Sequence, residues 1–236
     1  MIRREDNNRI AVIGSFALAL WQVLATPVFA FVALVVSPLP PLVRYAIIAK
    51  WSAGVIFFAR LFCGINYRVI GRENIPATPC IFFSRHESTW ETLAFQHILP
   101  PQAIVLRRSL LSIPFFGWGL RQMSPIAIDR ESGAAALKLM LRQGRERLRE
   151  GFCIVIFPEG TRLPPGETRP YRKGGAWLAE KLSAPVVPVA LDSGKCWRKN
   201  AFFKRRGLIT VRIGEPIPPD EADINARVQS WMKTAL

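Results

Sequence analysis

The sequence has few acidic residues, few histidines and no paired cysteine motif, and each shortage excludes a class of protein. Among its 236 residues, 17 aspartates and glutamates stand against 32 lysines and arginines, which gives a net charge of +15 at pH 7. Its four cysteines form no CxxC pair, so neither a zinc knuckle nor a redox motif is offered. The absence of a G-x-S-x-G elbow, a Walker loop and a G-x-G-x-x-G fingerprint argues against a serine lipase and against nucleotide binding.

The composition is that of a folded protein with a basic surface. Half of the residues are apolar and 21% are charged, which excludes an intrinsically disordered chain. The positive excess calls for a nucleic acid, an anionic membrane, or an acidic substrate or carrier as partner. Most of the basic residues are arginine, whose planar guanidinium matches a phosphate with two parallel hydrogen bonds.

The longest uncharged stretch, Ala11 to Val36, predicts a retained membrane helix. As a helix it spans roughly 39 Å, more than the ~30 Å of a bilayer core. A cleaved signal peptide, with a small-residue site at Val28-Phe29-Ala30, and a buried core helix are the alternatives. The stretch is longer than the apolar region of a signal peptide, and a core helix usually has a polar face.

A second apolar stretch, Leu42 to Cys63, follows a proline-rich turn at residues 37–41. Basic residues interrupt it, and its longest uncharged run, Trp51 to Ala59, is too short to span a bilayer. Basic and aromatic residues mixed in this way favour a helix at the membrane interface. Because basic residues flank the first segment on both sides, we expect a shallow hairpin kinked at Pro27 with both ends in the cytoplasm. Residues 1–65 are therefore predicted to be a membrane-associated helical segment.

Residues 66–236 are predicted to form one α/β domain, because short apolar runs alternate with helical patterns. The expected fold is a mixed, largely parallel sheet covered by helices on both faces, preceded by the membrane helix or hairpin. The expected strands are Tyr67–Ile70, Cys80–Ser84, Ala103–Leu106, Ile126–Ile128, Phe152–Phe157, Val186–Leu191 and Leu208–Ile213. The expected helices are Thr89–Ile98, Ser132–Arg149, Gly174–Leu182 and Glu221–Lys233.

Of the two histidines, His86 is the candidate for catalysis, whereas His97 is expected to be structural. His86 directly follows an apolar strand, and open α/β sheets bind ligands at the carboxyl ends of their strands. If His86 lies in the loop before the next helix, Glu91 falls in the first turn of that helix and can reach back to the imidazole. A carboxylate on one ring nitrogen makes the other a better general base. The alternative is that Glu91 only favours the helix N-terminus.

Two arginines are expected near His86. The sequence FPEGTR, Phe157 to Arg162, ends the most apolar strand, and Arg130 ends another apolar run. If the strands are parallel, both arginines lie on the same sheet edge as His86, which suits a substrate with a phosphate close to a hydroxyl. Local ion pairs, such as that of Arg162 with Glu159, are the alternative.

Together these motifs resemble the lysophosphatidic acid acyltransferase family, glycerolipid acyltransferases with a histidine–four residues–aspartate signature. The likeness covers residues 86–191 and is carried by His86, by IAIDR ending at Arg130, by FPEGTR at residues 157–162, and by the apolar strand Val187 to Leu191. Glu91 stands where the family normally has aspartate. The carboxylate is kept, so a working pair with His86 is expected.

The resemblance implies a membrane-bound enzyme that transfers an acyl group from acyl-CoA or acyl carrier protein to 1-acyl-glycerol 3-phosphate, giving phosphatidic acid for phospholipid biosynthesis. His86 is then the general base and Glu91 its partner, with no acyl-enzyme. The expected substrate-binding residues are Arg130, Glu159, Gly160, Thr161, Arg162, Lys173 and Arg107. Neither a metal nor a cofactor beyond the thioester co-substrate is expected. The expected location is the inner membrane, with the catalytic domain on its cytoplasmic face.

The expected partners are lysophosphatidic acid, the acyl thioester, an anionic membrane surface and, as one possible donor, acyl carrier protein, with no nucleic acid. The segment Lys195 to Arg206 mixes six basic residues with three aromatic ones, which suits an anionic membrane, an acidic carrier or single-stranded nucleic acid. Two other functions stay open. One is the same transfer to lyso-ornithine lipid, glycerol 3-phosphate or another lysophospholipid; the other is a non-catalytic basic protein on membranes or nucleic acid.

Overall fold

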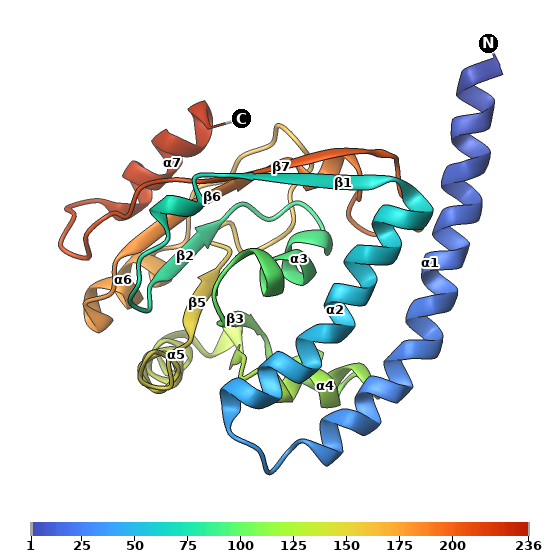
Figure 1. Ribbon diagram of the computed structural model, residues 1–236. Helices are drawn as coiled ribbons and strands as arrows, with labels where there is room; N and C mark the ends of the chain where they lie inside the picture. The colour runs from blue at the N-terminus through green and yellow to red at the C-terminus, as the bar shows by residue number, and fades with distance from the viewer. Residues whose placement is uncertain (1, 236) are drawn as a thin grey trace.

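The chain begins with two long helices that pack side by side (Figure 1). The structure, a computed structural model, describes the backbone of residues 2–235 and the side chains of residues 11–129 and 131–235. Helix α1 spans Ile2–Val35 and α2 spans Pro41–Cys63. Because α1 continues through Pro27, the chain reverses only at the turn after Val35. Gly64 caps the end of α2, and its φ of 65° is the left-handed conformation that glycine adopts freely.

Seven strands form one sheet beside this helical hairpin, in the order β1-β7-β6-β2-β5-β3-β4. Their bounds are Ile65–Ile70 (β1), Ile81–Ser84 (β2), Gln102–Arg107 (β3), Ile126–Ile128 (β4), Cys153–Ile156 (β5), Val186–Leu191 (β6) and Gly207–Ile213 (β7). All neighbouring pairs are parallel except β6 and β7. Every predicted strand is present, because each coincides with a short apolar run.

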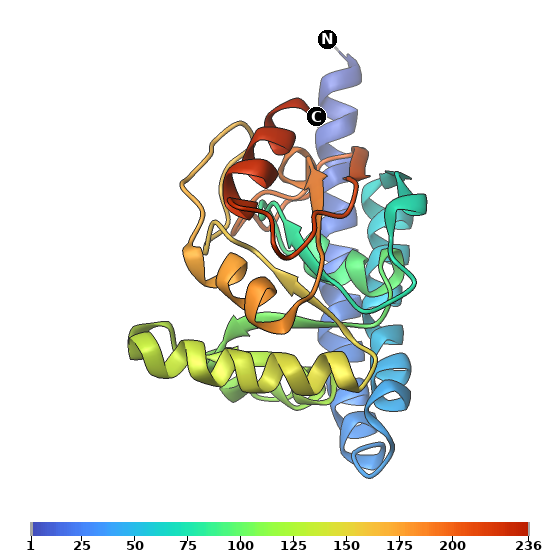
Figure 2. The ribbon, with the colours of Figure 1, turned by 90° about the vertical axis from the view of Figure 1, so that its left-hand side faces the viewer.

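Helices cover both faces of the sheet (Figure 2). One face packs against α2 and α3, and the other against α5, α6 and α7. These helices span Trp90–Ile98 (α3), Gly133–Arg149 (α5), Lys173–Leu182 (α6) and Ile224–Thr234 (α7). Along β2, Phe82 faces α3 while Ile81 and Phe83 face the opposite helices, as the alternation of strand side chains requires. The predicted mixed sheet with two helical layers is confirmed.

Helix α4, Phe116–Gln122, is missing from the sequence prediction. Its two glycines, Gly117 and Gly119, lower its helix propensity and so conceal it in the sequence. Gly117 is required there, because a Cβ at this position would lie 2.3 Å from the carbonyl oxygen of Leu111. Helix α4 contacts both α1 and α2, and Phe116 meets the ring of Trp51 edge-on at a centroid distance of 6.0 Å.

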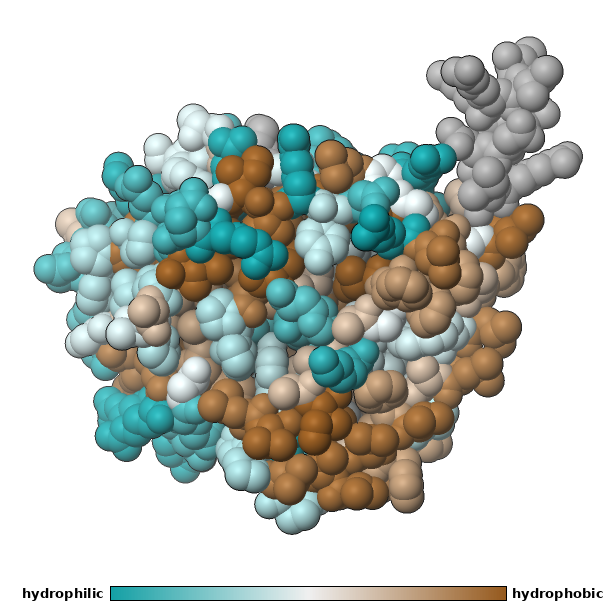
Figure 3. All heavy atoms as spheres, in the orientation of Figure 1, coloured by the Kyte–Doolittle hydropathy of each residue, from teal (hydrophilic) through white to brown (hydrophobic). Residues whose placement is uncertain are grey.

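Helix α1 leaves an apolar side uncovered, made of residues three or four positions apart. The most exposed of these side chains are Ile13, Phe16, Leu20, Val23, Leu24, Val28, Phe31 and Val35. In Figure 3 apolar side chains gather along the right and lower margin, where α1 and the turn to α2 lie. By length and composition, Ala11–Val35 and Pro41–Cys63 are each sufficient to cross a membrane. The short uncharged run of the second stretch therefore does not decide whether α2 spans.

Candidate active site

His86 lies in the loop between β2 and α3, next to the carboxylate expected to support it. Its ring Nδ1 is 2.8 Å from Oε1 of Glu91, which stands in the first turn of α3 after the N-cap Thr89. The expectation that Glu91 reaches back to the imidazole is confirmed. With Nδ1 engaged, Nε2 is the ring atom left to exchange a proton with a bound group.

Glu91 is fully buried and accepts hydrogen bonds from two different loops. Oε1 accepts from the backbone N–H groups of Glu87 and Ser88, at 2.9 and 2.8 Å. Oε2 accepts from the hydroxyls of Ser88 and Ser193, at 2.8 and 2.7 Å. Burial by itself raises the pKa of Glu91, but the charge and hydrogen bond of His86, with the donors on Ser88 and Ser193, hold the pKa below its usual value. Glu91 is therefore ionised beside the imidazole.

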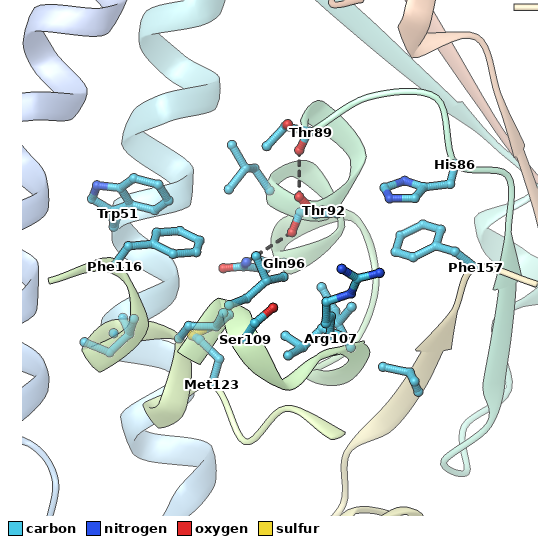
Figure 4. Close-up of a pocket in the computed structure, with 18 of the residues that line it drawn as sticks. Trp51, His86, Thr89, Thr92, Gln96, Arg107, Ser109, Phe116, Met123 and Phe157 are labelled. Atoms are coloured by element: carbon cyan, nitrogen blue, oxygen red, sulfur yellow. Dashed lines mark hydrogen bonds between the residues drawn. The ribbon is translucent and has the colours of Figure 1, made fainter. Parts of the chain in front are cut away.

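Two further contacts hold His86 in place, one on its backbone and one on its ring. Its backbone N–H donates to Oε2 of Glu159 at 3.0 Å, and its ring stacks on Phe157 with the centroids 4.0 Å apart. Figure 4 shows the two rings projecting together from one side of the cavity. Both supports come from the segment after β5, which lies beside β2 in the sheet. The alternative considered for Arg162, a local ion pair with Glu159, is absent from the described contacts, because this carboxylate is directed to the backbone of His86.

Two further buried carboxylates surround the His86 loop. Glu87 pairs with Nε of Arg85 at 2.8 Å and accepts from the backbone N–H of Gly194 at 2.8 Å. Burial raises the pKa of Glu87 and that of Glu159 to about 7 each, against the opposing effects of their hydrogen bonds and of Arg85. The loop is thus clasped on one side by the segment after β5 and on the other by the segment after β6.

His86 opens onto a cavity of about 550 Å³ that is polar at one end and apolar at the other. Near His86 it is lined by Arg107, Thr161 and Arg162. The rest of its wall is mostly apolar side chains from α1, α2, α3, β3 and α4, with a few polar ones, Thr26, Thr92, Gln96 and Ser109, among them. In Figure 4 Arg107 lies toward His86, whereas Trp51 and Phe116 close the far side. Such a site fits an amphiphile whose charged group lies beside His86.

The structure brings together most of the residues expected to bind substrate. Arg107, Gly160, Thr161 and Arg162 all line the cavity with His86, because β2, β5 and β3 are parallel neighbours. Two of the other expected residues do not line it: Glu159 is buried beneath His86, and Lys173 is exposed at the start of α6. The third, Arg130, has a side chain outside the described residues.

Several residues of the site were not found from the sequence. Ser193 and Gly194 bind the carboxylates of the His86 loop from a segment about a hundred residues away, and no local pattern marks them. Arg172 lies beside Gly160, where a Cβ would come within 2.6 Å of the Arg172 Nε. The one sequence signal for Arg172 is its place beside Lys173, directly before the two glycines Gly174 and Gly175 of α6.

The second histidine, His97, does not line the cavity. His97 contacts the Ser52 hydroxyl through Nε2 at 3.1 Å, and burial, with Lys50 nearby, lowers its pKa, as suits the structural residue predicted. Among the described side chains, no group of three or more histidines, cysteines, aspartates and glutamates is arranged to hold a metal ion.

The fold of this chain is similar to that of a solved structure. The crystal structure of the 1-acyl-sn-glycerophosphate acyltransferase from Thermotoga maritima superposes with a TM-score of 0.73 and 22% identity. It covers 98% of this chain and 93% of the other. The likeness shows that the two chains share a fold, the N-terminal helices included.

Curated relatives extend the likeness to the sequence. A 1-acyl-sn-glycerol-3-phosphate acyltransferase from Pseudomonas aeruginosa is 39% identical over 85% of this chain and 81% of its own length. One from Saccharomyces cerevisiae is 31% identical over 88% and 72%. The model of the family described as Acyltransferase matches residues 66–192, more than half of the chain and the part that holds His86 and FPEGTR. The chain belongs to the acyltransferase family.

Proposed function

We propose that this protein transfers a fatty acyl group from a thioester to the free hydroxyl of 1-acyl-glycerol 3-phosphate, giving phosphatidic acid. One observation carries the proposal: a histidine–carboxylate pair opens onto a cavity with arginines at one end and an apolar wall at the other. The names of the curated relatives support the same reaction.

His86 acts as the general base in this proposal. Its Nε2 removes the proton from the glycerol hydroxyl while that oxygen attacks the thioester carbonyl. A carbon–oxygen bond forms and the carbon–sulfur bond breaks, and the imidazolium returns its proton to the leaving thiolate. Glu91 orients the ring and stabilises its positive charge. No acyl-enzyme and no cofactor besides the thioester takes part, and the donor is acyl-CoA or acyl carrier protein.

Arg107 and Arg162 hold the phosphate of the acceptor. Both line the cavity near His86, and a guanidinium suits a phosphate through paired, charge-assisted hydrogen bonds. Thr161 adds a hydroxyl donor there. We also propose that Arg130, which follows β4, and Lys173, at the start of α6, contribute to binding the same phosphate. Fixing the phosphate places the reacting hydroxyl, which makes the attack effectively intramolecular.

The acyl chain of the lipid acceptor occupies the apolar part of the cavity, between α1, α2 and α4. This arrangement requires the lipid to enter from the side of the N-terminal helices, so these helices attach the enzyme to a membrane. The uncovered apolar side of α1 supports this attachment, because so many exposed apolar side chains on one helix need a cover. We place the enzyme at the inner membrane with the domain of residues 66–236 on the cytoplasmic face and residues 1–65 as the membrane segment.

The test is acyl transfer by purified membranes carrying wild-type protein or the His86→Ala variant. Donors are labelled acyl-CoA and acyl carrier protein; acceptors are lysophosphatidic acid, glycerol 3-phosphate and a phosphate-free lyso-lipid. His86→Ala should lower turnover of lysophosphatidic acid by at least about 100-fold. His97→Ala, at the other histidine, should remain active. Transfer to the phosphate-free lipid alone would overturn the phosphate role of Arg107 and Arg162.

A further inference from the structure

The loop at residues 195–206, between β6 and β7, carries more charge and aromatic surface than the proposed reaction uses. It holds six basic residues and no acidic one. Only Lys199 of this loop lines the cavity. The side chains of Phe202 and Phe203 are 44% and 52% exposed, although phenylalanine is ordinarily buried. We call this segment the basic–aromatic loop.

The basic–aromatic loop docks on the uncovered side of α1. The ring centroid of Phe202 lies 4.9 Å from that of Phe16, and the ring of Phe203 lies 6.4 Å from it. The backbone N–H of Lys204 donates to the Ser15 hydroxyl of α1 at 2.9 Å. Because Phe16 is itself 58% exposed, the two loop rings extend the apolar side of α1 without a break. Anything that covers this side of α1 also meets the loop.

A side chain of the loop forms hydrogen bonds with backbone carbonyl groups of the same loop, beside the exposed phenylalanines. The buried ammonium of Lys204 donates to the carbonyl oxygens of Ala201 and Phe202, at 2.9 and 2.7 Å, and lies 4.6 Å from the centre of the Trp197 ring. Carbonyl groups without such partners are costly where water is excluded. Lys204 is therefore used inside the loop, whereas Arg198, Arg205 and Arg206 are exposed.

We propose that the basic–aromatic loop is a second membrane contact that binds an anionic bilayer beside α1. Phe202 and Phe203 lie at the boundary of headgroups and acyl chains, and the exposed arginines bind lipid phosphates. An acidic carrier protein would use the arginines but not two phenylalanines continuous with a lipid-facing helix. The proposal rests on the membrane attachment of α1 proposed above.

The contact also sets where the cavity meets the bilayer. Lys199 extends from the loop to the cavity, and its Nζ donates to the carbonyl oxygen of Arg162 at 3.3 Å. A loop resting on lipid phosphates therefore keeps the phosphate-binding end of the cavity at headgroup level. A phosphate-bearing lyso-lipid in that leaflet then reaches Arg162 without leaving the interface.

The test uses an environment-sensitive fluorophore on a cysteine introduced in the full chain, as Phe203→Cys. The four native cysteines are buried, so the label selects the new thiol. Leu24→Cys, on the uncovered side of α1, and Glu180→Cys, exposed on α6, are the matched positions. Each protein is reconstituted in phosphatidylcholine vesicles with or without phosphatidylglycerol, and lipids with brominated acyl chains serve as quencher.

The proposal expects labels at 24 and 203 to be quenched and the label at 180 not. Omitting phosphatidylglycerol, or replacing Arg198, Arg205 and Arg206 by glutamine, should remove most quenching at 203. Replacing Arg142, Arg145 and Arg149 of α5 by glutamine should leave the quenching at 203 unchanged. Quenching at 24 without quenching at 203 would overturn the loop contact alone, and protection of 203 by added acyl carrier protein would then assign the loop to the carrier. No quenching at 24 would overturn the attachment of α1 and the loop contact with it.

Discussion

The longer side chain of Glu91 connects two loops that an aspartate could not join in the same way. One carboxylate oxygen reaches His86 and the other reaches Ser193, on the segment after β6. Shortening the side chain by one methylene, ~1.5 Å, would withdraw the carboxylate from one of them. In this chain the hydroxyl of Ser193 lies where the longer side chain can accept its hydrogen bond.

Ser193 should therefore matter for the rate. In Ser193→Ala, Glu91 loses a donor at a buried oxygen, and turnover should fall about tenfold. A carboxylate with fewer donors attracts the imidazole proton more strongly, so the acidic limb of the pH–rate profile should move to higher pH. Ser193→Thr, which keeps the hydroxyl, should restore both. The measurement is kcat against pH; an unchanged profile at lowered kcat would assign Ser193 a purely structural role.

The contact of Glu91 with His86 and its contact with Ser193 differ in how well the sequence predicts them. His86 and Glu91 are five residues apart around a helix start, so local capping rules bring them together. Ser193 meets Glu91 only because β6 lies beside β2, and that neighbourhood depends on the order of strands in the sheet. Strand order is a property of the whole fold, which no short pattern contains.

At the scale of elements, α1 and α2 approach closely because each places a glycine at the contact. A Cβ on Gly14 would lie 2.0 Å from the carbonyl oxygen of Phe62. A Cβ on Gly54 would lie 2.4 Å from the ring of Trp21. The first clash is with backbone, which cannot rotate aside. The distance between the two helices is therefore fixed by glycine.

Gly14→Ala should separate α1 from α2 and lower the free energy of unfolding by ~1–3 kcal/mol, despite the better helix propensity of alanine. The measurement is the thermal unfolding temperature in detergent. Gly119→Ala in α4 is the matched control, because its Cβ would meet Ile48 at an ordinary 3.9 Å. Equal unfolding temperatures for the Gly14 variant and wild type would show that the helices are not in close contact.

Elements with a single dominant signal are predictable from this sequence, and those with conflicting signals are not. The strands follow apolar runs bounded by proline, glycine or charged residues, and all seven were predicted. Helix α4 carries glycines that disfavour helix and aromatics that fit a strand equally well. Its helical form is decided by packing against α1 and α2, so tertiary contacts override local propensity there.

For the whole molecule, the buried carboxylates make stability depend on pH. Burial raises the pKa of Glu87 and of Glu159 to about 7, so the folded state holds protons there that the unfolded chain has released. The free energy of unfolding should therefore fall as pH rises from ~4.5 to 7, by up to ~3 kcal/mol for each of the two carboxylates. Glu91, whose pKa is lowered, acts oppositely and loses its contribution only at lower pH.

The check is the unfolding temperature between pH 5 and 8. In Glu159→Gln, the amide oxygen still accepts the hydrogen bond from the His86 backbone, but the side chain no longer titrates. The decrease of the unfolding temperature with rising pH should therefore become shallower. The exposed Glu180→Gln should leave the slope unchanged. A slope that is identical in wild type and in Glu159→Gln would contradict the raised pKa of Glu159.

The hydrogen bond between Ser15 and Lys204 has a consequence for how the protein is made. The two residues are 189 positions apart, so α1 has left the ribosome long before its partner in the basic–aromatic loop exists. Throughout that interval the apolar helix lacks much of the surface that covers it in the finished protein. A membrane or a chaperone has to shield α1 during translation, and the catalytic domain then folds onto a helix that is already in place.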